Sequence, residues 1–112
     1  MTPIQWLGSS RVDLKAFPTD ARRGAGFQLR LVQLGSDPND WKPMRTVGPG
    51  VREIRVHTGL EHRVVYVATF AEAVYVLHAF AKKTAKTTQR DVRIARVRFE
   101  ALLAKRRGTH GT

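Results

Sequence analysis

Three successive segments rich in Val, Ile, Tyr and Phe constrain the fold of this 112-residue chain most strongly. Residues of these types favour β-strands, and the two joints between the segments are short enough for antiparallel hairpins. The segments are residues 51–56, 62–70 and 73–81. They predict an antiparallel meander, and its last strand leads directly into a basic cluster at Lys82, Lys83 and Lys86.

Helical patterns precede the predicted meander. Residues 4–7 can form a short edge strand, and Ser9 or Ser10 can cap a brief helix after it. Apolar residues at helical spacing predict a second helix over residues 19–34. Gly35 is expected to end this helix, because glycine readily adopts the left-handed conformation that follows many helices.

Residues 36–50 contain repeated Asp, Asn, Pro and Gly, so we expect an irregular connection that Trp41 anchors by burial. After the meander, Thr87 or Thr88 can begin a final helix with a strongly basic face. The last residues, 108–112, are expected to fray.

Together these elements predict an α+β fold. An N-terminal helical pair and a C-terminal helix are expected to pack on one face of an antiparallel sheet. The length fits one domain spanning residues 1–112. Its ordered core is expected to extend from about residue 4 to about residue 106.

Positive charge is large and unevenly distributed. The chain has 20 Lys and Arg against 9 Asp and Glu, which gives a net charge of +11. Residues 1–40 hold five basic and four acidic groups, whereas residues 71–112 hold ten and three. Such an asymmetry favours a phosphate-rich partner, with RNA as the first hypothesis, and predicts salt-dependent binding. An acidic protein could also bind to the same positive charge.

Several functional classes lack their sequence signatures. With no cysteine, the chain has no disulfide, thiolate metal ligand or thiol nucleophile. No apolar run approaches the ~20 residues that span a bilayer, and residues 1–8 do not resemble a secretory signal. Phosphate-binding loops, serine-hydrolase motifs and metal-spaced histidine pairs are also missing. We therefore expect a cytoplasmic protein without membrane association, cofactor or metal.

Four stretches carry a resemblance to a known family. They are residues 40–44, 51–55, 63–68 and 73–84, the last of which contains a Phe-x-Lys-Lys-Thr motif followed by Lys86 and Thr87. With the order of elements, they resemble the RelE/ParE toxin superfamily, and more closely its phage-related, HigB-like branch. The resemblance covers roughly residues 4–104, and the combination is more specific than any single piece.

This resemblance implies a RelE-like fold and the toxin of a type II toxin–antitoxin system. Such toxins are ribosome-associated mRNA endoribonucleases (mRNA interferases) that inhibit translation, and a small antitoxin, often a helix-turn-helix protein, neutralises them. The catalytic positions that the resemblance implies are Arg55, Arg63, Lys82 and Lys83. The concentration of positive charge on and after the strands, and not the resemblance, suggests Arg52, Lys86, Arg90 and Arg93 as RNA-binding residues.

Basic side chains suit metal-independent cleavage, in which the RNA 2′-hydroxyl attacks the adjacent phosphorus. An Arg fork can contact two phosphoryl oxygens as their charge grows, and Arg63 is the first choice for this role, with Arg55 second. The base is left open among a lysine whose pKa neighbouring cations lower, His78, His57 and Glu53.

Each assignment has an ordinary alternative. Arg55 and Arg63 can be solvated strand residues, and His78 can be a hydrogen-bonded core histidine. Tyr66 and Tyr75 suit base stacking but are more often core residues. For the whole chain, the alternatives are a ParE-like inhibitor of DNA gyrase, or an inactive basic protein that only binds its antitoxin or nucleic acid. The basic positions favour the RNA-cleaving class.

Overall fold

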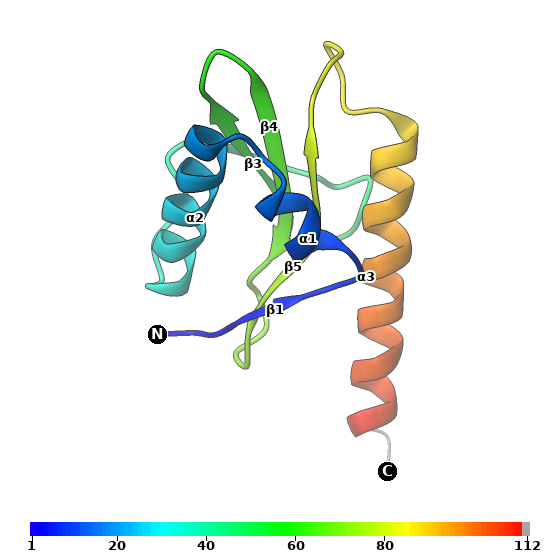
Figure 1. Ribbon diagram of the computed structural model, residues 1–112. Helices are drawn as coiled ribbons and strands as arrows, with labels where there is room; N and C mark the ends of the chain where they lie inside the picture. Colours follow the sequence, from blue (N-terminus) through cyan, green and yellow to red (C-terminus); the bar gives the residue numbers. More distant parts are fainter. Residues whose placement is uncertain (111–112) are drawn as a thin grey trace.

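The computed structural model describes residues 1–110, which form a five-stranded sheet with helices on both of its faces (Figure 1). The elements in chain order are β1 (Ile4–Trp6), α1 (Ser10–Lys15), α2 (Thr19–Gln33), β2 (Trp41–Pro43), β3 (Val51–His57), β4 (Glu61–Val67), β5 (Val74–Ala81) and α3 (Gln89–His110). The predicted α+β class, with two N-terminal helices and a C-terminal helix, is confirmed.

The strand order is β1-β5-β4-β3-β2. Strands β3, β4 and β5 form the predicted antiparallel meander, whereas β1 pairs with β5 in parallel, so the sheet is mixed. Strand β2 lies inside the connection that was predicted to be irregular, and that prediction is wrong for Trp41–Pro43. The outer edge of β3 supplies backbone partners that a lone segment lacks, as in the bond from Met44 N to Val51 O.

Two hydrophobic cores lie on opposite faces of the sheet. The first joins α1 and α2 to residues such as Ile54, Val64 and Val76. The second joins α3 to residues such as Val65 and Leu77. The expectation that all helices pack on one face is therefore wrong. The central strands are apolar on both sides, and a sheet of that kind buries both faces.

A β-bulge changes the alternation of β5. The register shifts between Val65 and Tyr66 of β4. As a result, two consecutive side chains of β5 lie on the face of the sheet that α3 covers. Leu77 belongs to the core under α3, while His78 lies opposite Val65 and contacts Asp91 of α3. The bulge thus brings a histidine to α3 that strict alternation would have turned away from it.

The ends of the two long helices follow the sequence signals. Gly35 has φ 86°, and Ser36 N donates to Leu31 O, which completes the helix end as predicted. Thr88 Oγ1 accepts from Asp91 N at the start of α3. The helix continues through His110 despite the predicted fraying, and residues 111–112 lie outside the described residues.

None of the helices within residues 1–110 combines the length and hydropathy of a bilayer-spanning segment.

Two glycines should respond oppositely to alanine. A Cβ at Gly48 would overlap the ring of Phe99 in the core under α3, so Gly48→Ala should lower the free energy of unfolding by about 1–3 kcal/mol. Gly26 is exposed on α2 with no atom within 4 Å of such a Cβ, so Gly26→Ala should raise it by up to about 1 kcal/mol. Urea unfolding of both variants tests this. Equal effects would contradict the close approach at Gly48.

Candidate functional site

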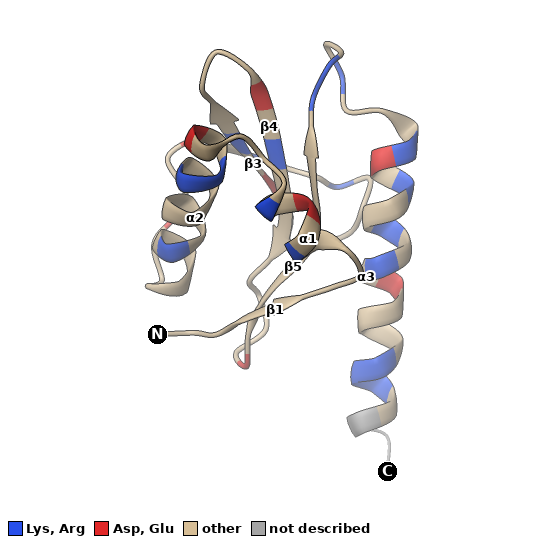
Figure 2. Cartoon of the chain, in the orientation of Figure 1, with Lys and Arg blue, Asp and Glu red and all other residues tan. Residues whose placement is uncertain are grey.

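Basic side chains gather on the α3 side of the sheet. Arg55 and Arg63 are direct partners in the β3–β4 ladder, Lys42 of β2 is the partner of Glu53, and Lys82 follows β5. We call Lys42, Arg55, Arg63 and Lys82 the cation cluster. Figure 2 shows lysine and arginine at the start of β4, after β5 and along α3.

Glu53 lies at the centre of this cluster and is fully buried. Its Oε1 atom is 3.6 Å from both Lys42 Nζ and Arg63 Nε. Its Oε2 atom accepts a 2.8 Å hydrogen bond from Thr87 Oγ1. One carboxylate therefore ties β2, β4 and the segment before α3 to β3.

Arg63 is only 5% exposed, so it is not a solvated strand residue. Its Nη1 atom donates to Glu61 Oε1 and to His62 O, both at 3.0 Å. Its Nε atom faces Glu53 without forming a hydrogen bond. Arg63 is thus held between two carboxylates.

Arg55 is half-buried on the same face, directly opposite Arg63. Its Nε atom is buried and has no hydrogen-bond partner among the described residues. Like charges opposite each other destabilise a sheet, and an unpaired buried donor costs about 1–3 kcal/mol. Unfavourable free energies of this kind are typical of functional sites. Here the two facing guanidinium groups are suited to bind an anion.

Lys82 stands where β5 ends, and its backbone N donates to Glu61 O at 2.8 Å. Partial burial lowers the pKa of its ammonium, and the charge of Arg63 lowers it further. Lys42 and Arg55 act in the same direction, and only Glu53 opposes them. A lysine with a lowered pKa is a better proton acceptor near neutral pH.

His57 is enclosed by two carboxylates. Its Nδ1 atom lies 2.8 Å from Glu61 Oε2, and its Nε2 atom lies 2.6 Å from Asp40 Oδ2. Hydrogen bonds to Glu61 and then to Asp40 raise the pKa of His57, and the bond from His57 lowers the pKa of Glu61. The two carboxylates hold the ring of His57 between them and favour its protonated form, in which both nitrogens can donate.

Two other histidines are buried. His78 is 5% exposed, stacks on Phe80 with centroids 4.9 Å apart, and places Nε2 2.8 Å from Asp91 Oδ1. Burial lowers the pKa of His78 by more than Asp91 raises it. His62 is 3% exposed against Phe17, and burial lowers its pKa as well.

Acid should therefore destabilise the fold. The unfolded histidines titrate near pH ~6.5, and below that value they take up protons that folded His62 and His78 resist, so stability rises with pH there. We expect the free energy of unfolding, measured with urea, to decrease between about pH 7 and about pH 5. Half-exposed His57, whose pKa is raised, contributes in the opposite sense.

The matched variant for this prediction is His78→Gln, which keeps a group that can donate to Asp91 but cannot titrate. The decrease in stability on acidification should be smaller in this variant than in the native chain. An unchanged pH dependence would show that burial of His78 does not contribute.

The remaining predicted site residues lie outside the cation cluster. Lys83, Lys86, Arg90 and Arg93 are exposed on the segment after β5 and on the first turns of α3. Arg52 lies on the opposite face of β3, where it stacks 3.8 Å above the Trp41 ring and pairs with Asp37. Within the described part of the chain, no three or more His, Asp or Glu residues are placed to hold a metal ion.

Lys42 is the member of the cluster that the sequence analysis missed. It lies in β2, within a stretch of the chain that carries several Pro and Gly residues. The only sequence signal was its position beside Trp41, in a stretch that already belonged to the family resemblance.

Tyr66, which was considered for base stacking, is 1% exposed and belongs to the core. Its ring therefore offers no face to a base.

Comparison with known proteins gives one family. No curated protein matches this chain. A family model described as "Phage derived protein Gp49-like (DUF891)" matches residues 12–100, a stretch that includes the whole cation cluster. This is a RelE-type, toxin-like family, and membership in it implies an antitoxin partner. The chain therefore belongs to the phage-derived Gp49-like family of RelE-type, toxin-like proteins.

Proposed function

We propose that this chain is the toxin of a type II toxin–antitoxin system in the HigB-like branch, and that it is a ribosome-associated mRNA endoribonuclease of the cytoplasm. The observation that carries the proposal is the pairing of Arg55 with Arg63 on one face, beside Lys42 and Lys82. Within the described part of the chain, the carboxylates that form ion pairs with these four cations are those of Glu53 and Glu61. The excess of two positive charges suits a phosphodiester.

In this proposal the RNA 2′-hydroxyl attacks the adjacent phosphorus, the bond to the 5′ oxygen breaks, and a 2′,3′-cyclic phosphate remains. Negative charge grows on the phosphoryl oxygens during the step. Arg55 is assigned the contact with them, because its half-buried side chain forms no ion pair within the described residues. An interaction that strengthens as charge develops accelerates the reaction and not merely binding.

Arg63 takes a different role from the one first assigned to it. It is almost fully buried and bonded to Glu61 and to the backbone of His62. A guanidinium held in this way adds positive potential to the site and positions Glu53 and Glu61. We therefore assign direct phosphate contact to Arg55 and a positioning role to Arg63.

Lys82 is the proposed proton acceptor for the 2′-hydroxyl. The other candidate bases are engaged elsewhere: Glu53 with Thr87, His57 with two carboxylates, and His78 with Asp91. Neutral Lys82 takes the proton on Nζ, and the departing 5′ oxygen takes one from water. Lys83 and Lys86, exposed on the same segment, contact the RNA backbone on either side of the cut.

Mapping RNA ends in cells tests this function. Expression of the native chain should create new 5′ ends inside coding sequences, with 2′,3′-cyclic phosphate on the upstream fragments. Lys82→Met should remove most of these ends, whereas Lys15→Met, which changes an exposed lysine of α1, should not. DNA breaks without new RNA ends would replace the proposal by gyrase inhibition. Growth arrest without either would point to a protein that only binds.

A further inference from the structure

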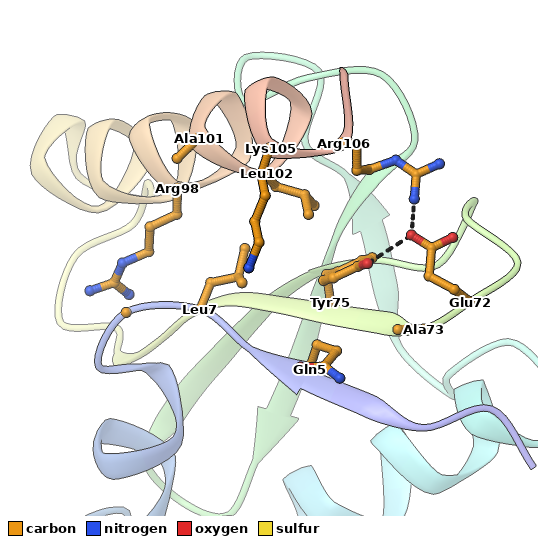
Figure 3. A pocket seen from close by; sticks show the side chains of 11 residues that line it. Gln5, Leu7, Glu72, Ala73, Tyr75, Arg98, Ala101, Leu102, Lys105 and Arg106 are labelled. Carbon is orange, nitrogen blue, oxygen red and sulfur yellow. Dashed lines mark hydrogen bonds and ion pairs between the residues drawn. The ribbon is translucent and has the colours of Figure 1, made fainter. Parts of the chain in front are cut away.

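A groove of about 720 Å³ lies far from the cation cluster, between α3 and the edge of the sheet (Figure 3). Its floor is formed by Leu7, Ala73 and Tyr75, and its wall by Ala101 and Leu102 of α3. It lies beside the beginning of β5, whereas the cation cluster lies at the end of that strand. The groove is therefore a second surface and not an extension of the first.

The groove arises because the two elements beside β5 differ in length: β1 has three residues, whereas α3 has 22. Helix α3 packs on β5, and β1 continues the sheet beyond β5 for only three residues. Gln5 of β1 is exposed, and Leu7 is only partly buried against the core under α3. Figure 3 shows β1 on one side of the hollow and α3 on the other. This part of the sheet is left with an uncovered, largely apolar strip.

The rim of the groove is positive. Arg98, Lys105 and Arg106 line it, and Glu72 is the one acidic residue among its lining. Arg106 forms an ion pair with Glu72 and lies 3.8 Å above the ring of Phe70. Among the described residues that line the groove, three are basic and one is acidic, so the rim around the apolar floor is mainly basic.

These features select among possible occupants. A second copy of this chain would bring its own net charge of +11 to a positive rim, which opposes association. RNA presents phosphates to the rim but has nothing to bury on aliphatic Leu7 and Leu102. A helix with one apolar face and acidic flanks satisfies both the floor and the rim, in the helix-in-groove mode of recognition. The volume lies within the ~300–1,000 Å³ range of ligand pockets.

We propose that this groove docks an amphipathic helix of an acidic protein partner, with its apolar face on Leu7, Tyr75 and Leu102 and its carboxylates toward Lys105 and Arg106. If the partner is the antitoxin, that identification rests on the proposed function. Docking here leaves the cation cluster uncovered, so the partner would hold the chain through one surface while the other remains open.

Titration with designed peptides tests the docking chemistry. The probe is an 18-residue helix with Leu at i, i+3, i+4 and i+7 and Glu at the flanking positions, and the control peptide carries Lys in place of Glu. We expect the acidic peptide to bind at least about tenfold more tightly than the basic one, and its affinity to fall as salt rises. Equal affinity of the two peptides would overturn the proposal.

Two matched variants locate the contact. Ala101 lines the groove, whereas Ala104 is exposed on the same helix and does not. Ala101→Glu should weaken the acidic peptide at least about tenfold, and Ala104→Glu should change its affinity less than about threefold. Thermal unfolding would confirm that both variants fold. Equal weakening by both would show that the peptide binds elsewhere.

The peptide titration contains no RNA, so its outcome is independent of the proposed nuclease. Absence of RNA cleavage together with groove binding would remove the proposed function and keep the docking surface. Cleavage without groove binding would do the reverse.

Discussion

Arg55→Gln is expected to lower the rate of RNA cleavage by about 100-fold to 1,000-fold, the loss typical of removing one donor to a developing negative charge. The cause is the loss of the guanidinium whose buried Nε has no partner within residues 1–110. The measurement is the single-turnover rate of the purified protein on ribosome-bound mRNA. The fold should persist, because no salt bridge of Arg55 is lost in the described part of the chain.

Arg52→Gln is the matched control. It changes the same residue type on the same strand, but on the opposite face, where Arg52 stacks on Trp41 and pairs with Asp37. The cleavage rate should change less than about threefold, since a rim charge contributes mainly to encounter. Similar losses in both variants would mean that total charge matters and that the cation cluster does not.

Arg63→Ala is expected to lower the free energy of unfolding by about 3 kcal/mol or more. Glu53 is fully buried, and Arg63 is one of the two cations 3.6 Å from its Oε1 atom. Among the described residues, removing Arg63 leaves this carboxylate with one ion-pair partner, Lys42, and the hydrogen bond from Thr87. It also removes the hydrogen bond to Glu61. Urea unfolding of the purified variant measures the loss.

A double-mutant cycle separates this ion pair from general packing. Glu53→Gln removes the buried charge, so the double variant Glu53→Gln/Arg63→Ala should lose clearly less stability than the sum of its two single variants. Additive losses would mean that Arg63 stabilises the fold through contacts other than Glu53. This result also explains why Arg63→Ala is a poor test of catalysis, since its loss of activity would be mixed with unfolding.

The central strands could be predicted from sequence because their apolar content decides their conformation locally. Residues 64–67 are apolar without alternation, and this pattern indicates burial on both faces. The helices were nevertheless all expected on one face of the sheet, and this expectation is wrong. Strand β2 could not be predicted, since its three residues include Pro43 and become a strand only by pairing with β3.

The site could be predicted in part. Arg55 and Arg63 were identified, but that they face each other depends on the β3–β4 register, which the turn around Gly59 sets. Lys42 enters only through the pairing of β2 with β3. His78 reaches α3 because of the bulge at Val65. In each case the missing information was a pairing between distant segments, which local residue preferences do not specify.

The central claim is that the cation cluster receives the scissile phosphate, and nitrogen-15 NMR of the arginine side chains tests it most directly. The protein is titrated with an RNA oligonucleotide that carries 2′-O-methyl groups and cannot be cleaved. We expect the Nε–H resonance of Arg55 to shift strongly with RNA concentration, while that of Arg52 stays in place. A shift of Arg52 with an unmoved Arg55 would contradict the claim, because the RNA would then lie on the opposite face of the sheet.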